Sequence, residues 1–384
     1  MTWQTKKLDD VIDKVVYTKK IHRKMFLSSG RFPIVSQEQD FINGYWDSEK
    51  DVFKIKKPVA IFGDHTQVLK YVDFDFVLGA DGVKILQSKP FLDSKYFYYS
   101  LQNVNLKSLG YARHFRLLKD ADITYPESLD EQKRIVKLLD EVFEKVTVAK
   151  ENAEKNLQNS KELFESYLQS VFARPGKDWE EFTLGDKELL GIIDGDRGKN
   201  YPKKSDFLVD GYCLFMNTKN VRPDGFDFTT TMFVTEKKDK ALGNGKLQRN
   251  DVVMTTRGTI GNLGVYSDDV KYDSIRINSG MLIFRPNTKK ILPDYLFEIL
   301  RSGIVKTQIR EHVSGAAQPQ LPIKTLVNFV IPVPKSLAEQ KAIVKKLDTL
   351  SVETKKLEKI YEQKLADLDE LKKSVLSKAF RAEL

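Results

Sequence analysis

Apolar residues recur with a helical period in two long stretches of the chain. The first stretch opens with SLDEQKRIVKLLD at residue 128 and the second with SLAEQKAIVKKLD at residue 336, a constant offset of 208 positions. In both, the apolar positions follow one another mostly in steps of three and four, the spacing along the seam of a coiled coil. The expected seam positions are Ile135, Leu139, Val142, Val146, Ala149, Leu157, Leu163 and Tyr167 on the first stretch, and Ile343, Leu347, Leu350, Leu357, Leu365, Leu371 and Val375 on the second.

Each stretch is expected to form one continuous helix. Neither residues 128–173 nor residues 336–384 contain glycine or proline, and a helix of about 45 residues is roughly 68 Å long. Ser128 and Ser336 each stand three residues before a glutamate, which is the spacing of a capping box. Because each helix has an apolar stripe that it cannot bury alone, the two are expected to pair. An antiparallel pair is favoured, since residues 174–335 then connect neighbouring helix ends.

The other two segments show shorter apolar runs broken by glycine and aspartate, such as KPVAIFGDHT and NDVVMTTRGTIGNLGVY. Such runs are typical of short strands and turns. WQTKKLDD at residue 3 and WEEFTLGD at residue 179 share Trp, Leu and Asp at equal spacing, so the segments resemble each other faintly. The pattern predicts α/β plus long helices: two α/β domains, residues 1–127 and 174–335, separated by an antiparallel two-helix coiled coil made by residues 128–173 and 336–384.

Charge and composition narrow the possible partners. The chain has a formal net charge of +9, and the excess of Lys and Arg lies on the two segments outside the helices, which favours an anionic partner there. A single cysteine, Cys213, excludes an internal disulfide and a cysteine-based zinc site and indicates a reducing cytoplasm. No apolar run approaches the ~18–20 residues that a bilayer requires, and the first residues lack a signal-peptide core, so no membrane partner is expected.

The repeated element resembles that of the specificity subunits of type I restriction-modification systems. The family's pattern is matched in the second copy by Pro332, Pro334, Leu337, Glu339, Gln340, Ile343, Val344, Leu347 and Asp348, and in the first by Pro126, Leu129, Glu131, Gln132, Ile135, Val136, Leu139 and Asp140. The resemblance implies two target-recognition domains, each reading one half of a bipartite target in double-stranded DNA. Because the two segments differ in sequence, an asymmetric target is expected.

The same resemblance implies the partners. The paired helices would set the spacer between the half-sites and dock two methyltransferase subunits, which bring S-adenosylmethionine. Two restriction/translocase subunits would complete the complex, with ATP and Mg in the nuclease subunit. The chain itself is then a non-catalytic cytoplasmic subunit that binds no cofactor and no metal.

Candidates for base reading are long polar side chains in the expected loops. Arginine suits bidentate pairing with guanine, and glutamine or asparagine suits adenine. In the first segment they are Gln37, Gln39, His65, Thr66, Gln67, Lys70, Arg113, His114 and Arg116, and in the second Lys219, Asn220, Arg222, Arg257, Arg276, Asn278, Gln318 and Gln320.

Two other functions stay open. Asp224, Glu236 and Lys238 fit the pattern of a metal-dependent nuclease, although a Pro-Asp-Gly turn followed by a charged loop explains the same residues. A coiled-coil adaptor without a DNA role is the second alternative. A phosphate-binding GxxxxGK[ST] loop and an Asn/Asp-Pro-Pro-aromatic methyltransferase motif are both absent from the sequence.

Overall fold

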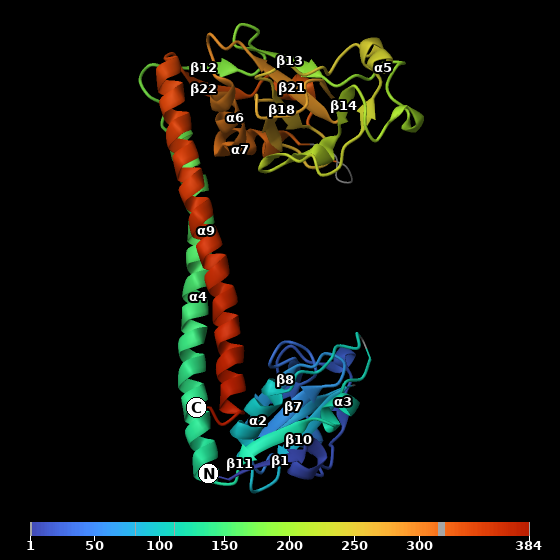
Figure 1. Ribbon diagram of the computed structural model, residues 1–384, viewed down its shortest axis with the longest axis vertical. Coiled ribbons are helices and arrows are strands. Elements are labelled where there is room, and N and C mark those ends of the chain that lie inside the picture. Colours follow the sequence, from blue (N-terminus) through green and yellow to red (C-terminus); the bar gives the residue numbers. More distant parts are fainter. Residues whose placement is uncertain (1, 81, 111, 314–318, 384) are drawn as a thin grey trace. The chain divides into compact units, whose positions relative to one another are not determined.

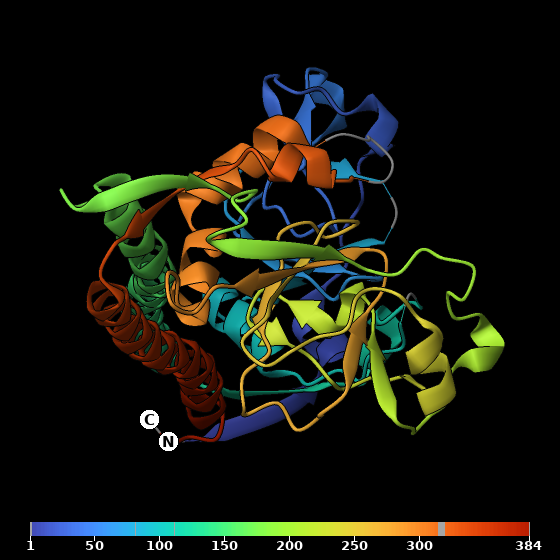
Figure 2. The same ribbon diagram turned by 90° about the horizontal axis from the view of Figure 1, so that it is seen from above.

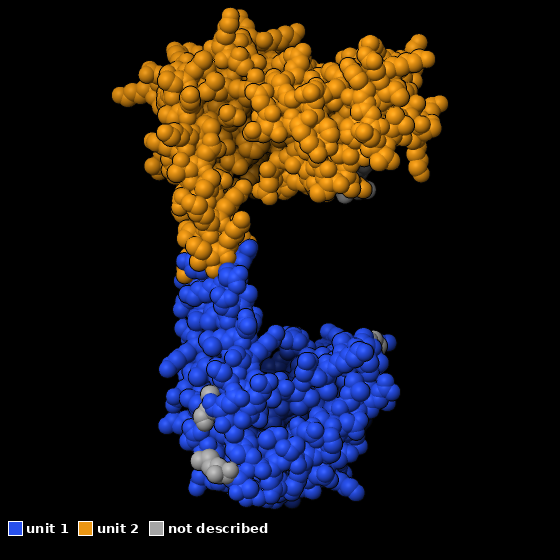
Figure 3. Space-filling model, in the orientation of Figure 1, with its two compact units in different colours: residues 1–155, 361–384 blue, residues 156–360 orange. Residues whose placement is uncertain are grey.

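The computed structural model describes residues 2–80, 82–110, 112–313 and 319–383. They form two compact units, coloured separately in Figure 3. Unit 1 contains residues 1–155 and 361–384, and unit 2 contains residues 156–360. Each unit therefore combines one globular segment with part of both long helices, which are labelled α4 and α9 in Figure 1.

Unit 1 is built on three small sheets. The first has the order β2-β10-β7-β8 and is antiparallel throughout, and in the second β9 lies parallel to β3 and β4. The strands are β1 (Trp3–Lys7), β2 (Ile12–Asp13), β3 (Lys20–Ile21), β4 (Phe32–Val35), β5 (Gly44–Trp46), β6 (Val52–Phe53), β7 (Val59–Gly63), β8 (Leu69–Val72), β9 (Phe76–Gly79), β10 (Val83–Ser88) and β11 (Asp122–Pro126). The helices of its globular part are α1 (Leu8–Val11), α2 (Ser94–Asn103) and α3 (Phe115–Lys119).

Unit 2 repeats this plan. Its antiparallel sheet has the order β13-β21-β18-β19, and β14 pairs in parallel with β20, as β4 does with β9 in unit 1. The strands are β12 (Trp179–Thr183), β13 (Leu190–Asp194), β14 (Cys213–Met216), β15 (Val221–Arg222), β16 (Gly225–Phe226), β17 (Phe233–Val234), β18 (Val252–Thr255), β19 (Leu263–Val265), β20 (Ile275–Ile277), β21 (Met281–Pro286) and β22 (Val330–Pro334). The helices are α5 (Glu236–Ala241), α6 (Pro293–Arg301), α7 (Gly303–His312) and α8 (Ile323–Leu326).

The faint sequence repeat therefore marks one fold used twice. Trp3 of β1 faces Pro126 of β11, and Trp179 of β12 faces Pro334 of β22. Helix α2 packs on the sheet of unit 1, and α6 packs on the matching sheet of unit 2, where α7 follows it (Figures 1 and 2). Tyr96 of α2 and Tyr295 of α6 are fully buried on the inner faces of these helices, and burying a large side chain of this kind stabilises by roughly 1.5–3 kcal/mol.

The two long helices are α4 (Leu129–Ala173) and α9 (Leu337–Ala379). Ser128 and Ser336 precede them, and each serine Oγ accepts the backbone N–H of the glutamate three residues later at 3.4 Å. The expected helix starts are thus confirmed. The first turn of each helix also holds a fully buried glutamine, Gln132 or Gln340.

The helices pair in opposite directions, as expected. In unit 1 the start of α4, including Leu139, shares a core with the end of α9, including Leu376. In unit 2 the end of α4, including Leu168, shares a core with the start of α9, including Leu347. Lys150 and Asp369 join the two helices within unit 1, with 2.7 Å between Nζ and Oδ1.

Four expected seam positions are on the surface instead. Leu163, Tyr167, Leu357 and Leu371 are 49%, 36%, 39% and 46% exposed, while Leu168 and Leu376 are 1% and 6% exposed. The step from Leu157 to Leu163 is six residues. In a helix with 3.6 residues per turn, this step places Leu163 on a different face from the apolar stripe. The packed face instead continues through Phe164 and Leu168. The other expected seam residues are buried or half-buried.

Candidate nucleic-acid interface

Four loops of unit 1 meet around Gln37. The hydroxyl Oγ1 of Thr66, in the turn between β7 and β8, donates to the Gln37 carbonyl at 2.6 Å. The backbone N–H of His65 donates to Gln37 Oε1 at 3.2 Å. Gly82 closes in from the β9–β10 turn with φ +66°, and a Cβ there would lie 2.3 Å from Gln37 Oε1. Only glycine fits that left-handed position, so loop 36–43 and these two turns are held as one group.

The fourth loop, which carries Leu109 and leads into α3, is fastened to this group by His114. Leu109 N–H donates to His114 Nε2 at 2.9 Å, so Nε2 is the unprotonated ring nitrogen. His114 Nδ1 therefore carries the proton and donates to the Asp64 carbonyl at 3.1 Å. The Asp64 carboxylate in turn accepts Phe115 N–H at 2.7 Å. His114 is 1% exposed, and it holds the loop rather than facing a ligand.

Unit 2 brings the topologically equivalent loops together. Thr256 N–H, just after β18, donates to the Gly280 carbonyl in the β20–β21 turn at 2.8 Å. Asn278 N–H donates to the Met216 carbonyl at the end of β14 at 2.9 Å. Arg257 forms an antiparallel bridge with Gln320. The same four connections of the fold thus converge in each unit, which makes them the candidate recognition surface of each unit.

Most expected recognition residues lie on these loops, or on α3 and β15 to which the loops lead, and have accessible side chains. Those of unit 1 are Gln37, Gln39, His65, Thr66, Gln67, Arg113 and Arg116, and those of unit 2 are Lys219, Arg222, Arg257, Asn278 and Gln320. Gln318 lies outside the described residues. The remaining four, Lys70, His114, Asn220 and Arg276, are at most 7% exposed.

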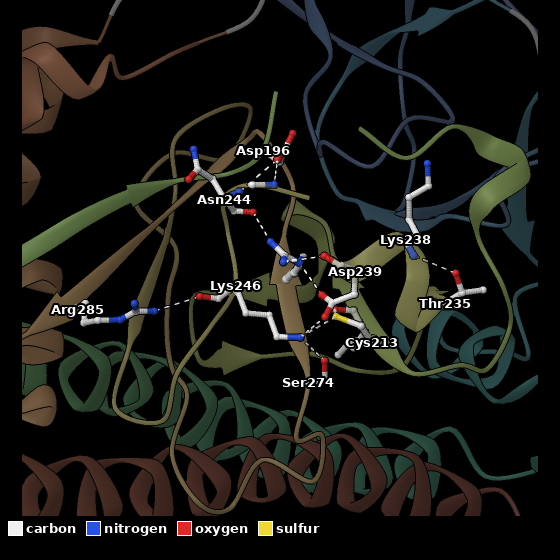
Figure 4. A network of polar contacts seen from close by, with 12 residues as sticks. Asp196, Cys213, Thr235, Lys238, Asp239, Asn244, Lys246, Ser274 and Arg285 are labelled. Atoms are coloured by element: carbon white, nitrogen blue, oxygen red, sulfur yellow. Dashed lines mark hydrogen bonds and ion pairs between the residues drawn. The ribbon is translucent and has the colours of Figure 1, made fainter. Parts of the chain in front are cut away.

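Arg276 belongs to a buried polar network rather than to a free surface. Its Nε lies 2.5 Å from Asp239 Oδ1, and Nη1 donates to the Asn244 carbonyl at 2.7 Å. Figure 4 shows Lys246 facing Asp239 and Ser274, and Lys246 Nζ lies 2.8 Å from Asp239 Oδ2. Burial alone would raise the pKa of the Asp239 carboxyl, but hydrogen bonds from Lys246 and Arg276 hold it below its usual value. The expectation of an exposed Arg276 is corrected: β20 turns it inward.

Asn220 is likewise structural. Its Nδ2 donates to the carbonyls of Asp227 and Thr230 at 2.9 and 2.7 Å, and its Oδ1 accepts Asn217 N–H at 3.0 Å. These bonds close the turn that follows β14 and leave Lys219 exposed on its outside. Lys70 plays a similar part in unit 1, where its Nζ bonds to the Asp40 carbonyl.

Sequence reasoning missed Arg197. Its Nε lies 3.0 Å from Asp194 Oδ2, and its Nη2 donates to the Ser279 carbonyl at 3.2 Å, beside Asn278. The side chain is 48% exposed. In the sequence this arginine stands in the segment DGDRGKN, and nothing in that segment shows that it lies beside a turn more than 80 residues away.

The three residues of the nuclease alternative are engaged separately. Glu236 pairs with Lys240 at 2.7 Å, and Lys238 pairs with Asp206 at 3.0 Å. Asp224 lines a cavity of about 810 Å³ beside α7, which neither Glu236 nor Lys238 lines. Within the described residues, no group of three His, Cys, Asp or Glu side chains could hold a metal ion. In the same part of the chain, none of the helices is both long and apolar enough to cross a bilayer.

Comparisons with known proteins agree on one family. The family model described as type I restriction modification DNA specificity domain matches residues 1–158 and 176–366. The chain is 26% identical over 368 residues to the type I restriction enzyme EcoBI specificity subunit of Escherichia coli, covering 89% of this chain and 75% of that protein. It is 28% identical over 309 residues to the MjaVIII specificity subunit of Methanocaldococcus jannaschii, covering 74% and 70%.

Solved structures share the fold along the whole chain. The HsdS subunit from Thermoanaerobacter tengcongensis aligns with a TM-score of 0.59 and 19% identity, covering 100% of this chain and 97% of that one. A chain from a type I R-M system studied for complex assembly and conformational transition aligns with a TM-score of 0.74 and 18% identity, covering 100% and 98%.

Proposed function

Since the chain belongs to the type I restriction-modification DNA specificity family and serves in DNA target recognition without catalysis of its own, we propose that its two four-loop clusters read the two halves of the target. The observation that carries this proposal is that the same four connections converge in both units. Their accessible side chains are amides and cations, which hydrogen-bond to base edges and phosphates.

The two clusters differ in chemistry, which supports an asymmetric target. The loop after β4 exposes Gln39, whereas the turn after β14 exposes Lys219 and leads to Arg222. Equivalent positions that carry different donors and acceptors select different bases. We propose that the paired helices α4 and α9 fix the spacer between the half-sites.

The helices also offer a repeated surface for partners. Leu163 and Leu371 stand 208 positions apart in the repeat and are 49% and 46% exposed. A surface that occurs once on each helix suits a partner present in two copies. We propose that this partner is a methyltransferase subunit that brings S-adenosylmethionine. We further propose that two restriction/translocase subunits with ATP and Mg join the complex. The complex then works in the cytoplasm, where the host DNA lies.

The test of the proposal is the methylation pattern of the host. Methylome sequencing with and without this gene should show one bipartite motif that depends on it. Exchanging residues 179–320 for the matching segment of another specificity subunit should change one half of that motif and leave the other unchanged. A change in both halves contradicts the assignment of one cluster to each half-site.

The alternatives give different results. Binding of a motif duplex should weaken steeply as salt rises, because phosphate contacts release counterions, and salt-independent or absent binding would favour an adaptor. DNA cleavage by the isolated chain with a divalent metal would favour the nuclease built on Asp224, Glu236 and Lys238.

A further inference from the structure

Loop 36–43 of unit 1, which contributes Gln37 to the candidate recognition surface, also exposes two large apolar side chains. Phe41 is 46% exposed and Ile42 is 40% exposed. The same loop carries Gln37, around which the four loops meet, and Gln39. Exposed apolar residues that lie next to a binding surface are candidates for contact with the ligand.

The backbone of this loop is fixed at both ends by the β7–β8 hairpin. At one end, Thr66 and His65 hold Gln37, as described above. At the other end, Lys70 of β8 donates through Nζ to the carbonyl oxygens of Asp40 and Phe41, and to Asn43 Oδ1 at 3.1 Å. Asn43 adds a bond from Nδ2 to the Asp40 carbonyl at 3.0 Å and accepts Ser36 N–H at 2.8 Å.

The clamp is built from a buried amine. Lys70 is 3% exposed, and burial lowers the pKa of its amino group to about 8, against the opposing influence of Glu38 and Asp40. Burying a lysine is costly unless its charge is satisfied. The hydrogen bonds from Lys70 to two loop carbonyls satisfy this charge, and they fix the backbone that carries Phe41 and Ile42.

The side chains differ from their counterparts in unit 2. The equivalent turn after β14 is closed by buried Asn220 and exposes the cation Lys219. Phosphates attract cations and give an apolar side chain nothing to bond, whereas the C5-methyl group of thymine offers an apolar contact in the major groove. Phe41 also packs edge-on against Phe74, with 5.9 Å between ring centroids, which favours contact from the surface over insertion between bases.

We propose that loop 36–43 is a base-reading loop of unit 1 and that Phe41 and Ile42 contact the C5-methyl group of a thymine in the half-site read by this unit. Lys70 is the positioning residue of the loop. This inference rests on the proposed function, because it assumes that the surrounding cluster faces DNA.

The test uses the full chain with its methyltransferase subunits and duplexes that carry the methylated motif. The half-site of unit 1 is the half that survives exchange of residues 179–320. Each thymine of that half is replaced in turn by uracil, which pairs identically and lacks the methyl group. At one position at least, affinity should fall about fourfold, the value of one buried methyl-sized group.

The double variant F41A/I42A should bind the thymine duplex more weakly and show no further loss with uracil. Val209→Ala, which removes a 93% exposed apolar side chain from unit 2, is the matched control and should keep the wild-type ratio. Equal affinity for thymine and uracil at every position, a half-site without thymine, or an unchanged ratio in F41A/I42A would overturn the inference. Failure of the wild-type complex to bind the motif would instead overturn the proposed function.

Lys70→Met tests the positioning role separately. It keeps most of the length of the side chain and removes the amine, so the thymine-to-uracil ratio should fall toward one while the salt dependence of binding stays unchanged. A uniform loss of affinity with an unchanged ratio would show that Lys70 only supports the fold. Protection of the Ser36 and Asn43 amides from hydrogen exchange reports whether the loop has loosened.

Discussion

Gln132 and Gln340 make the same three hydrogen bonds in the two halves of the chain. Gln132 accepts Asp93 N–H at 2.7 Å and donates to the carbonyls of Phe91 and Pro126 at 3.1 and 2.8 Å. Gln340 accepts Leu292 N–H at 2.8 Å and donates to the carbonyls of Lys290 and Pro334, both at 2.9 Å. Each glutamine thus links its long helix to the start of a short helix. It also links the long helix to the strand that directly precedes it, β11 before α4 and β22 before α9.

We expect Gln132→Ala to destabilise unit 1 by about 2–4 kcal/mol, because it leaves one buried and two half-buried backbone groups without this partner. Hydrogen exchange should lose protection at the Asp93 amide, while the Leu292 amide of unit 2 stays protected. Gln158→Ala, on an exposed face of α4, is the control and should change neither. Unchanged protection at Asp93 would show that the bonds of Gln132 are dispensable.

Substitutions of Leu168, which is buried, and Leu163, which is exposed, test core packing and partner docking separately on helix α4. Leu168→Ala should cost about 2–5 kcal/mol of unfolding free energy, since it opens a cavity in the core of unit 2. Leu163→Ala should leave the denaturation curve of the free chain nearly unchanged and weaken co-purification of the methyltransferase subunit. If Leu163→Ala and the matching Leu371→Ala both retain the partner fully, the docking surface lies elsewhere.

Arg257 and Lys219 should have different effects on DNA binding. Arg257 bridges to Gln320 within the unit 2 cluster and has an accessible guanidinium, so Arg257→Ala should relax the sequence preference of that half-site by about 1–3 kcal/mol. Lys219→Ala should weaken binding to all sequences and reduce the salt slope by about one, as expected for a phosphate contact. Binding measured on duplexes mutated in each half distinguishes the two, and a loss of preference in the half-site of unit 1 would contradict this assignment.

The stability of unit 2 should rise on acidification. Burial raises the pKa of Glu298 from 4.5 to about 7, although the Arg301 guanidinium opposes this with bonds of 2.6 and 2.8 Å. The folded state therefore holds more protons than the unfolded state between pH 4.5 and 7, so this contribution is present below that window and lost as the pH rises through it. The change should be on the order of 3 kcal/mol.

Glu298→Gln should flatten this dependence, and Glu188→Gln, at an exposed ion pair, should not. Unit 1 supplies an internal comparison, because Tyr99 stands at the matching place on α2 and donates to Asp140 at 2.5 Å. The effect is measured by chemical denaturation at several pH values, with unfolding monitored through hydrogen exchange of unit 2 amides. A stability that falls on acidification over this range in wild type, and equally in Glu298→Gln, would refute the role of Glu298.

The sequence was sufficient for features with a local cause. The helix starts at Ser128 and Ser336 follow from side chains three residues away, and the pairing of α4 with α9 follows from two stripes of equal period. The predicted seam was wrong at Leu163, because the step of six residues from Leu157 breaks the spacing of three and four. Leu163 and Phe164 are both apolar, so residue type alone does not show which of them is packed. Periodicity fixes which face is buried only if the phase is kept.

The site was harder to predict because burial depends on distant partners. Arg276 is held by Asp239, 37 residues earlier in the chain, and His114 by Asp64, 50 residues earlier. No local pattern separates such arginines and histidines from exposed ones. The loops themselves could be predicted from their glycines and polar residues, whereas their convergence in space required the strand order.

The packing of α9 onto unit 1 constrains how the protein is made. Phe380 lies against Tyr96, with 5.1 Å between ring centroids, and Leu376 and Ala379 belong to the same core. A ribosome adds these residues only after all of unit 2, so the first globule emerges with part of its apolar core uncovered. Nascent chains should therefore depend on chaperones until α9 is released, and premature termination within α9 should yield an aggregation-prone product even though the first globule is complete.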